Sequence, residues 1–452
     1  MTDATGLRPD ESLPGSLDGL RVLDFTWSVL GPTMTRNLAS LGAEVLKVEW
    51  PRNPDPMRTV MYAAGEQNPG LDNSPFFTNL NTGKRSLTLD AKSERGREIV
   101  RALVARCDVV AESFSARVFR SWGLGYDQLA EINPGIVYVS ASGFGHSGPY
   151  EHYETWGPTA QALTGVTAIS GQPGQPPAGW GWSYLDTMGG ALATVAVLAA
   201  LNERERSGRG QYIDLSQTEA GLGLTGPSFL DATANGRTPS GATFPPGNRS
   251  VAGTGATAVY GYRGEIGVPY NCFRTRGGGH NDFVVITVLS DDEWRRLVTA
   301  MGEPEWARAE VLADLDGRLE HQDVIDARLN EWTAAFDKYE LMRRLQAVGI
   351  RCGAVQSNEN LAEHDDQVRH RGLYTTLEHP LLGSRRFEGM PIASDQSRTA
   401  VRPQWPILGE GNDYVLRTLL GLADDEIDRL DRDGVTWPAG MPKDVKVTRA
   451  LW

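Results

Sequence analysis

Cysteine is scarce in this chain of 452 residues, which contains three of them, Cys107, Cys272 and Cys352. They lie far apart, with no CxxC pair and no Cys/His cluster at the spacing of metal ligands. We therefore expect no bound metal, and we expect reduced thiols in a cytoplasmic protein.

Positive charge is also in short supply. The chain has 44 Lys and Arg against 57 Asp and Glu, which gives a formal net charge of −13. General binding to nucleic acid or to an anionic membrane depends on an excess of basic residues, so neither kind of partner is expected. A ligand that carries phosphate must be bound by a few local basic groups.

Long hydrophobic runs are missing too. The most apolar stretch, Gly189 to Leu201, is too short to span a bilayer, and Met1 to Gly19 is polar and acidic, unlike a signal peptide. We expect neither secretion nor membrane insertion.

Strand and helix patterns alternate through the first half of the chain. The expected strands are Arg21 to Thr26, Glu44 to Glu49, Arg85 to Leu89, Asp108 to Ala111, Ile136 to Ser140 and Gln211 to Ser216. The expected helices are Pro32 to Leu41, Glu94 to Cys107, Ala116 to Gly123, Tyr153 to Gly165 and about Asp186 to Arg206. This alternation predicts an α/β fold with a doubly wound, mostly parallel sheet.

The length favours two lobes, because one hydrophobic core rarely grows this large. We assign residues 1–235 to a large lobe, 236–267 to a Gly/Thr-rich linker, 268–375 to a smaller α+β lobe, and 376–452 to a segment that returns to the large lobe. The later elements expected are a strand at Phe283 to Val288 and helices at Asp292 to Met301, Gln322 to Val348 and Asn412 to Leu422.

No GxGxxG or GxxxxGK[ST] fingerprint follows the first strand, which disfavours a nucleotide-dependent dehydrogenase. Instead, Trp27 to Pro32 leads directly into a helix. The free N–H groups of a helix N-terminus can bind pyrophosphate, but an ordinary strand-to-helix turn would look the same.

Long segments in a fixed order resemble one known family, and they extend over nearly the whole chain. They include LDGLRVLDFT (17–26), GPTMTRNLASLGAEVLKVE (31–49), the stretch from NTGKRS to AESF (81–114), LDTMGGALATVAVLAALNERERSGRGQYIDLSQTEA (185–220) and PILGEGNDYVLRTLLGL (406–422). The sequence resembles the class III CoA-transferases of the CaiB/BaiF type, which include formyl-CoA transferases and, by divergence, α-methylacyl-CoA racemases. The resemblance implies an interlocked homodimer that takes an acyl-CoA donor and a carboxylic acid acceptor, with CoA as substrate and no permanently bound cofactor.

The resemblance assigns the catalytic carboxylate to Asp186, at the start of a DxxxG-type helix that continues to Gly190. Transfer of CoA between two acids requires an enzyme carboxylate that can hold the acyl unit. From the residues alone, an ordinary helix N-cap is the favoured interpretation of Asp186, and a residue can both cap a helix and act in catalysis.

The family's CoA-binding positions fall on six residues here: Val29, Leu30, Leu89, Lys92, Ser113 and Phe114. Lys92 would supply charge for a phosphate and Phe114 a surface for adenine. Without the resemblance, a solvated lysine and a core phenylalanine would explain both. The family's next arginine is displaced, and Arg120 or Arg117 would replace it.

Some positions depart from the formyl-CoA transferases. Their glutamine after the first strand is Val29, and their basic residue after the second strand is Trp50. Aromatic residues Trp180, Trp182 and Tyr184 precede Asp186, which favours a roomier pocket for a larger acid. The run Gly277 to Gly279 is either the family's active-site loop or a hairpin turn.

Two other functions are compatible with the same fold. A 2-methylacyl-CoA racemase needs a histidine that faces the aspartate across the substrate, but the aligned segment here is Thr155-Trp156-Gly157, and His146 and His152 are misplaced. A CoA-binding protein without catalysis is disfavoured by the presence of Asp186.

Overall fold

The computed structural model describes residues 12–60, 70–168, 184–235 and 267–438, with four single positions between 176 and 181. The chain divides into two compact units. The described parts of Met1–Gln161, Gly181–Gly221 and Gln367–Trp452 form unit 1, and those of Ala162–Trp180 and Leu222–Asp366 form unit 2. The predicted linker, 236–267, lies outside the described residues except for Gly267.

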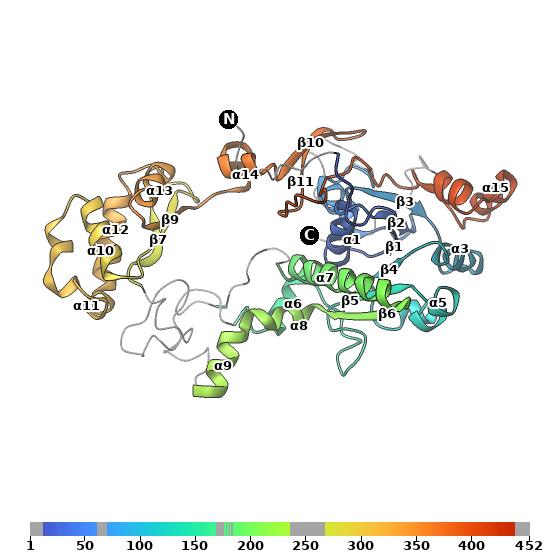
Figure 1. The fold of residues 1–452 in the computed structure, drawn as a ribbon, viewed down its shortest axis with the longest axis horizontal. Helices are drawn as coiled ribbons and strands as arrows, with labels where there is room; N and C mark the ends of the chain where they lie inside the picture. Colours follow the sequence, from blue (N-terminus) through green and yellow to red (C-terminus); the bar gives the residue numbers. More distant parts are fainter. Residues whose placement is uncertain are drawn as a thin grey trace. The chain divides into compact units, whose positions relative to one another are not determined.

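Unit 1 is built on a six-stranded sheet in which every neighbouring pair of strands is parallel (Figure 1). The strands are β1 (Arg21–Phe25), β2 (Glu44–Glu49), β3 (Lys84–Thr88), β4 (Val109–Glu112), β5 (Val137–Ser142) and β6 (Gln211–Ser216). Their order is β3-β2-β1-β4-β5-β6. The direction of winding therefore reverses between β1 and β4, where α/β folds commonly bind ligands.

Each face of this sheet is buried against helices. Alternate strand residues point to opposite faces, so Val22 and its neighbour Leu23 belong to different core clusters. Helices α1 (Leu30–Ser40) and α7 (Tyr184–Ser207) contribute to one cluster, and α3 (Glu94–Val104) and α5 (Tyr126–Ile132) to the other. The predicted α/β class with a mostly parallel sheet is confirmed.

Helix α7 extends beyond both ends of the apolar stretch Gly189 to Leu201. It has 24 residues, and it is the one helix in the described part of the chain that is long and apolar enough to cross a membrane. Here it acts as a core helix, since Ala193, Val197 and Ala200 are buried under the sheet. A Cβ atom on Gly190 would lie 2.8 Å from the backbone oxygen of Leu30, so glycine lets α7 approach the start of α1.

The remaining elements of unit 1 are short. They are η1 (Pro56–Thr59), α2 (Pro75–Asn81), α4 (Val118–Ser121), α6 (Gly157–Leu163), α8 (Gln217–Leu222), the hairpin β10 (Tyr374–His379) and β11 (Gly383–Glu388), η7 (Tyr414–Leu419) and α15 (Asp424–Arg432). The helix predicted from Asn412 to Leu422 is a short π-helical segment, and α2, α5 and α15 were not expected from the sequence.

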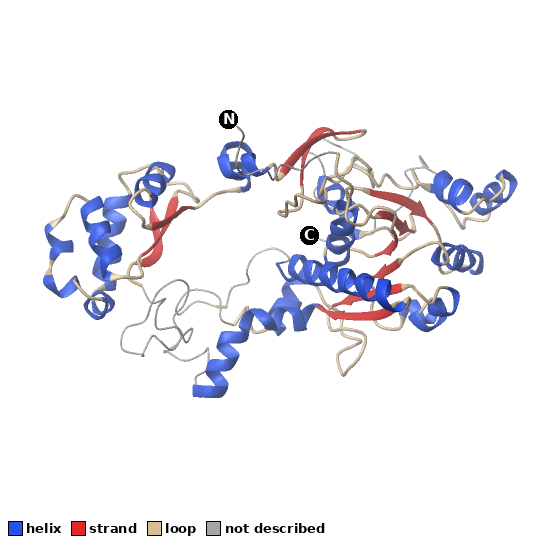
Figure 2. Cartoon of the chain, viewed as in Figure 1, coloured by secondary structure: helices blue, strands red, loops and turns tan. Residues whose placement is uncertain are grey.

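Unit 2 contains a three-stranded antiparallel sheet and several helices (Figure 2). Its main elements are α9 (Gly226–Asn235), β7 (Tyr270–Arg274), β8 (Phe283–Thr287), α10 (Asp291–Ala300), α11 (Leu315–Glu320), α12 (Gln322–Thr333), α13 (Lys338–Gln346) and β9 (Arg351–Ala354), followed by α14 (Asp366–Arg371) at the boundary with unit 1.

Two sequence expectations concern unit 2. The single helix predicted from Gln322 to Val348 is wrong, because the Asp337 side chain accepts hydrogen bonds from two backbone N–H groups and starts a new helix, α13. Residues Gly277 to Gly279 form part of the hairpin between β7 and β8. A role for them as an active-site loop stays a prediction.

Candidate functional site

The loops after β1 and β4 meet at the point where the sheet reverses its winding. The backbone N–H of Trp27 donates a 2.8 Å hydrogen bond to the Ser113 hydroxyl. The rings of Trp27 and Phe114 meet edge to face, with centroids 5.4 Å apart. The two loops thus form one surface at the carboxyl edge of the sheet.

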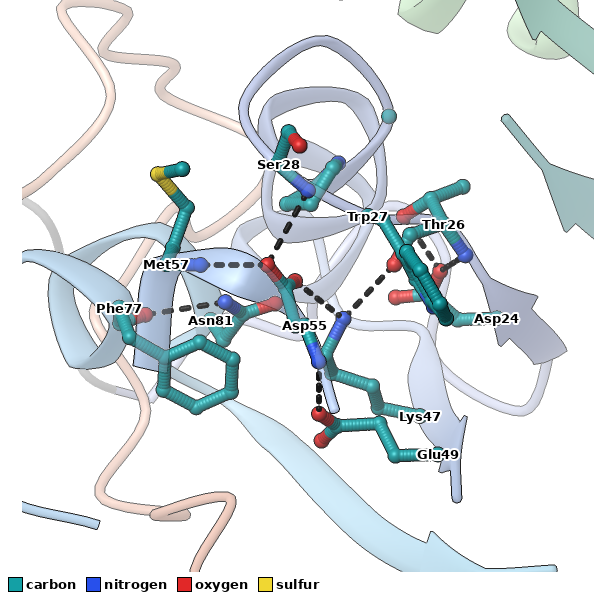
Figure 3. A network of polar contacts seen from close by, with 12 residues as sticks. Asp24, Thr26, Trp27, Ser28, Lys47, Glu49, Asp55, Met57, Phe77 and Asn81 are labelled. Carbon is teal, nitrogen blue, oxygen red and sulfur yellow. Dashed lines mark hydrogen bonds and ion pairs between the residues drawn. The ribbon is translucent and has the colours of Figure 1, made fainter. Parts of the chain in front are cut away.

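A buried ionic network supports the loop after β1 (Figure 3). Lys47 from β2 donates to the backbone oxygen of Thr26 at 2.8 Å and pairs with Asp55 at 3.2 Å. Asp55 in turn accepts a 3.2 Å hydrogen bond from the backbone N–H of Ser28, which has a left-handed φ of 62°. The network holds Trp27 and Ser28 in a conformation that a loose loop would seldom adopt.

Below this loop lies a second buried pair, Asp24 and Lys84, with 3.1 Å between the charged atoms. Asp24 also accepts hydrogen bonds from the backbone and side chain of Thr26. Burial lowers the pKa of Lys84 to about 8. Asp24 accepts a 2.8 Å hydrogen bond from the Thr35 hydroxyl, and Lys84 donates to the carbonyl oxygen of Pro32 at 3.2 Å, so the start of α1 is anchored from both β1 and β3.

One cavity of about 210 Å³ opens beside the ends of β1, β2 and β3. Three of the predicted CoA-binding residues line it: Leu89, Lys92 and Phe114. The ammonium group of Lys92 lies 5.8 Å from the ring centre of Trp122, which lines the same cavity. Aromatic and apolar walls with one amine beside them suit a purine base with a phosphate at its edge.

A larger cavity of about 500 Å³ contains Asp186. Its wall includes two more of the expected contacts, Leu30 and Ser113, and again Phe114. Trp27 and Phe114 line both cavities, so the two adjoin at this pair of rings.

Asp186 is the third residue of α7 and is partly buried. It therefore lies within the first turn rather than at the cap. In the first turn of a helix the dipole favours a negative charge. A Cβ atom on Gly189 would lie 2.6 Å from Cδ1 of Leu30, so glycine lets this leucine side chain pack directly against α7. The close approach brings the first turn of α7 to the carboxyl edge of the sheet.

The comparison with known proteins agrees with this architecture. The profile of CoA-transferase family III matches residues 17–412. The chain is 34% identical to the formyl-CoA:oxalate CoA-transferase of Streptomyces coelicolor and 32% identical to that of Rhodopseudomonas palustris. These alignments cover 93% and 94% of this chain and 99% and 98% of the relatives. The chain belongs to CoA-transferase family III.

Solved structures similar to this family III enzyme share its fold. A CaiB/BaiF family protein from Brucella suis superposes with a TM-score of 0.76 at 28% identity, over 90% of this chain and all of that protein. A Mycobacterium tuberculosis protein gives 0.72 at 25% identity, over 89% of this chain and all of that protein. The predicted family and enzyme class are confirmed.

Two of the predicted CoA contacts in the transferase lie outside both cavities. Val29 is buried in an apolar cluster with Met57, Val60 and Phe77. Arg120 is exposed and lines a small cleft of about 10 Å³, and Arg117 at the same cleft pairs with Glu151 at 2.7 Å. A contact between Arg120 or Arg117 and the CoA phosphates stays a prediction.

The backbone of Phe114 in the transferase is held from both sides. Its N–H donates to the Glu112 carboxylate at 2.8 Å, and its carbonyl lies 3.2 Å from His146 Nε2. Burial raises the pKa of Glu112. His146 therefore supports the loop that carries Phe114, whereas the residues that line the Asp186 cavity include no histidine in the part of the chain described.

Sequence reasoning missed several residues that the transferase brings to these cavities. They are Trp27, Asn53 and Trp122 beside Lys92, and Ser142, Phe144, Tyr153 and Gln217 beside Asp186. Four of them, Trp27, Ser142, Phe144 and Gln217, lie at the C-terminal end of a strand or within two residues of it. This position was the available signal, because the carboxyl ends of parallel strands share one edge. Across the described ranges, no group of three or more His, Cys, Asp or Glu residues is arranged to hold a metal ion.

Proposed function

We propose that this enzyme transfers CoA from an acyl-CoA to a free carboxylic acid, with Asp186 as the carboxylate that carries the acyl unit. The observation that carries this proposal is the position of Asp186 in a cavity of about 500 Å³ that adjoins the Lys92 cavity at Trp27 and Phe114. This arrangement supplies separate places for the nucleotide and for the reacting thioester.

The smaller cavity suits the adenine end of CoA. Trp122 and Phe114 offer ring faces for the base, and Lys92 stands at the rim for a phosphate. The thiol arm then passes Trp27 and Ser113 toward Asp186. Since the protein has a net charge of −13, a local cation such as Lys92 is needed to offset the charge of CoA.

The reaction proceeds through two enzyme-bound acyl species. An Asp186 oxygen attacks the thioester carbonyl, the C–S bond breaks, and CoA leaves as a thiolate, which gives a mixed anhydride. The thiolate then attacks the aspartyl carbonyl and releases the first acid as a carboxylate, which leaves an aspartyl-CoA thioester. The acceptor carboxylate repeats these steps in reverse order.

We infer a larger acid than formate or oxalate. Val29 is packed in the core, Trp50 replaces a basic residue, and Phe144, Tyr153 and Trp156 line the Asp186 cavity. Glu151 and Glu154 also line it, without Lys or Arg among the described residues of its wall. This wall favours an acid whose remainder is apolar or aromatic and carries no second negative charge.

A racemase on the same fold is disfavoured by the same wall. Racemisation needs an acid and a base on opposite sides of the α-carbon. Where the racemases have histidine, this wall carries Trp156 and Gly157. A CoA-binding protein without catalysis would have no use for Asp186 in the cavity.

We also propose an interlocked homodimer in the cytoplasm. Leu192 and Val195 on α7 are 45% and 62% exposed, and Ala191 and Ala199 are exposed on the same helix. Such an uncharged stripe would be covered by a second copy. Sedimentation at decreasing concentration should show a dimer throughout, and a natively folded monomer would contradict the interlocked arrangement.

The function is tested by incubating the protein with a panel of acyl-CoAs and free acids, including formate, oxalate and larger monocarboxylates. Mass spectrometry of the CoA pool should show exchange with a larger monocarboxylate. No exchange with any pair would contradict the proposal, and racemisation of a 2-methylacyl-CoA would favour the alternative reaction.

A further inference from the structure

Two residues that line the Asp186 cavity each carry a buried polar side-chain atom without a hydrogen-bond partner among the described residues. The two atoms are the amide nitrogen Nε2 of Gln217 and the hydroxyl oxygen of Ser142. Gln217 is only 4% exposed. Buried donors are almost always paired in folded proteins, so two unpaired donors on residues that line one cavity point to a ligand that pairs with them.

The fold fixes both residues at the carboxyl edge of the sheet. Ser142 ends β5 and is paired in register with Ser216, the last residue of β6, so Gln217 follows at once as the first residue of α8. The backbone and side chain of Thr218 both donate to the carbonyl oxygen of Gly143, at 3.0 and 2.6 Å. This double contact ties the start of α8 to the end of β5.

Gln217 also lies close to the helix that carries Asp186. A Cβ atom built on Gly189 would lie 3.9 Å from Cγ of Gln217. Gly189 is three residues after Asp186, and residues with this spacing share one face of a helix. The Gln217 side chain therefore lies along the face of α7 from which Asp186 enters the cavity.

The chemistry of the cavity limits what these donors can bind. With Glu151, Glu154 and Asp186 in its wall and no Lys or Arg among the described lining residues, a carboxylate in this cavity would be bound by uncharged donors. An amide N–H and a hydroxyl are donors of this kind, and hydrogen bonds to a charged oxygen are stronger than those to a neutral one.

We propose that Gln217 and Ser142 form the subsite that binds the carboxyl oxygens of the acid substrate. This inference rests on the proposed CoA transfer. The pair holds the acceptor carboxylate so that one oxygen attacks the carbonyl carbon of the Asp186–CoA thioester and releases the CoA thiolate, while the acid's remainder extends toward the aromatic wall. Gln217 is thus a substrate-binding residue.

The test is Gln217→Met, which keeps the length of the side chain but cannot donate a hydrogen bond. The kcat/KM for the acceptor acid should fall about 10- to 100-fold, the effect of losing a hydrogen bond to a charged group. The dissociation constant for CoA should change by less than about twofold, because the nucleotide and the phosphate contact of CoA lie in the other cavity. Ser142→Ala should reduce the same kcat/KM by a smaller factor.

Gln128→Met is the matched control, since Gln128 is exposed on α5 and lines neither cavity. It should retain wild-type kinetics. An unchanged kcat/KM for the acid in Gln217→Met, or a parallel loss of CoA affinity, would overturn the subsite. If Gln217→Met does not fold, Ser142→Ala decides alone: a selective loss of acid kcat/KM supports the subsite, and wild-type kinetics overturn it. Failure of the proposed function is distinct, because the wild-type enzyme would then exchange no CoA.

Discussion

The rings of Trp27 and Phe114 lie edge to face, 5.4 Å apart, at the point where the Lys92 cavity and the Asp186 cavity adjoin. One ring follows β1 and the other follows β4, the two strands between which the sheet reverses its winding. In the proposed function, this pair separates the nucleotide of CoA from the thioester that reacts.

Replacing Lys92 by Ala should weaken CoA binding. Its ammonium group is the basic group that lines the smaller cavity among the described residues, and it lies 5.8 Å from the ring of Trp122. The loss should be about 0.5 to 2 kcal/mol, the range for a partly exposed hydrogen bond to a charged group. Isothermal titration with CoA measures it.

Arg106→Ala is the control for this variant. Arg106 is an exposed cation just beyond the C-terminal end of α3, the helix that follows Lys92, and it lines neither cavity. It removes the same charge from the protein and should leave CoA affinity unchanged. Equal CoA affinities for Lys92→Ala and the wild type would show that the CoA phosphates bind elsewhere.

Much of the sheet could be predicted from the sequence, because a buried parallel strand appears as a short apolar run. Strands β2 and β6 match their predicted bounds. The break between α12 and α13 could not be read from periodicity, since it depends on the Asp337 side chain capping a new helix inside a continuous amphipathic pattern.

The candidate site could be predicted only in part. Asp186, Lys92 and Phe114 came from the family resemblance, and the structure places them around two adjoining cavities. Gln217 could not be found in this way, because its relevance depends on a missing hydrogen-bond partner, which only coordinates reveal.

The buried amine of Lys84 should make stability depend on pH in the alkaline range. Burial lowers the pKa of Lys84 from 10.5 to about 8. Between these values the unfolded chain retains a proton that the folded protein has released, so the contribution of Lys84 to the free energy of unfolding increases as the pH rises. Below about pH 8 its contribution is constant and least favourable.

Urea unfolding of the wild type and Lys84→Met at pH 7.5 and 9.5 measures this effect. Other groups titrate in both proteins, so the difference between the two isolates Lys84. The wild type should gain about 1 to 2 kcal/mol relative to the variant at the higher pH. A constant difference, or one of opposite sign, would show that Lys84 is protonated throughout.

The three thiols should react unequally. Burial raises the pKa of Cys107 and of Cys352 to about 12, and both are buried, whereas Cys272 is exposed. At pH 8 a maleimide should modify Cys272 in the native protein and all three cysteines after unfolding. Peptide mapping identifies the sites, and rapid native labelling of Cys107 would contradict its burial.

The most direct measurement is mass spectrometry of the peptide that contains Asp186, after a brief incubation with the acyl-CoA that exchanges fastest. The account predicts an adduct on Asp186 that hydroxylamine removes, because anhydrides and thioesters are activated carbonyls. Asp186→Ala and Asp186→Asn should give no adduct and only background transfer while still binding CoA, which separates lost chemistry from lost fold. Substantial transfer by both variants, or an adduct on a different residue, would contradict the central role of Asp186.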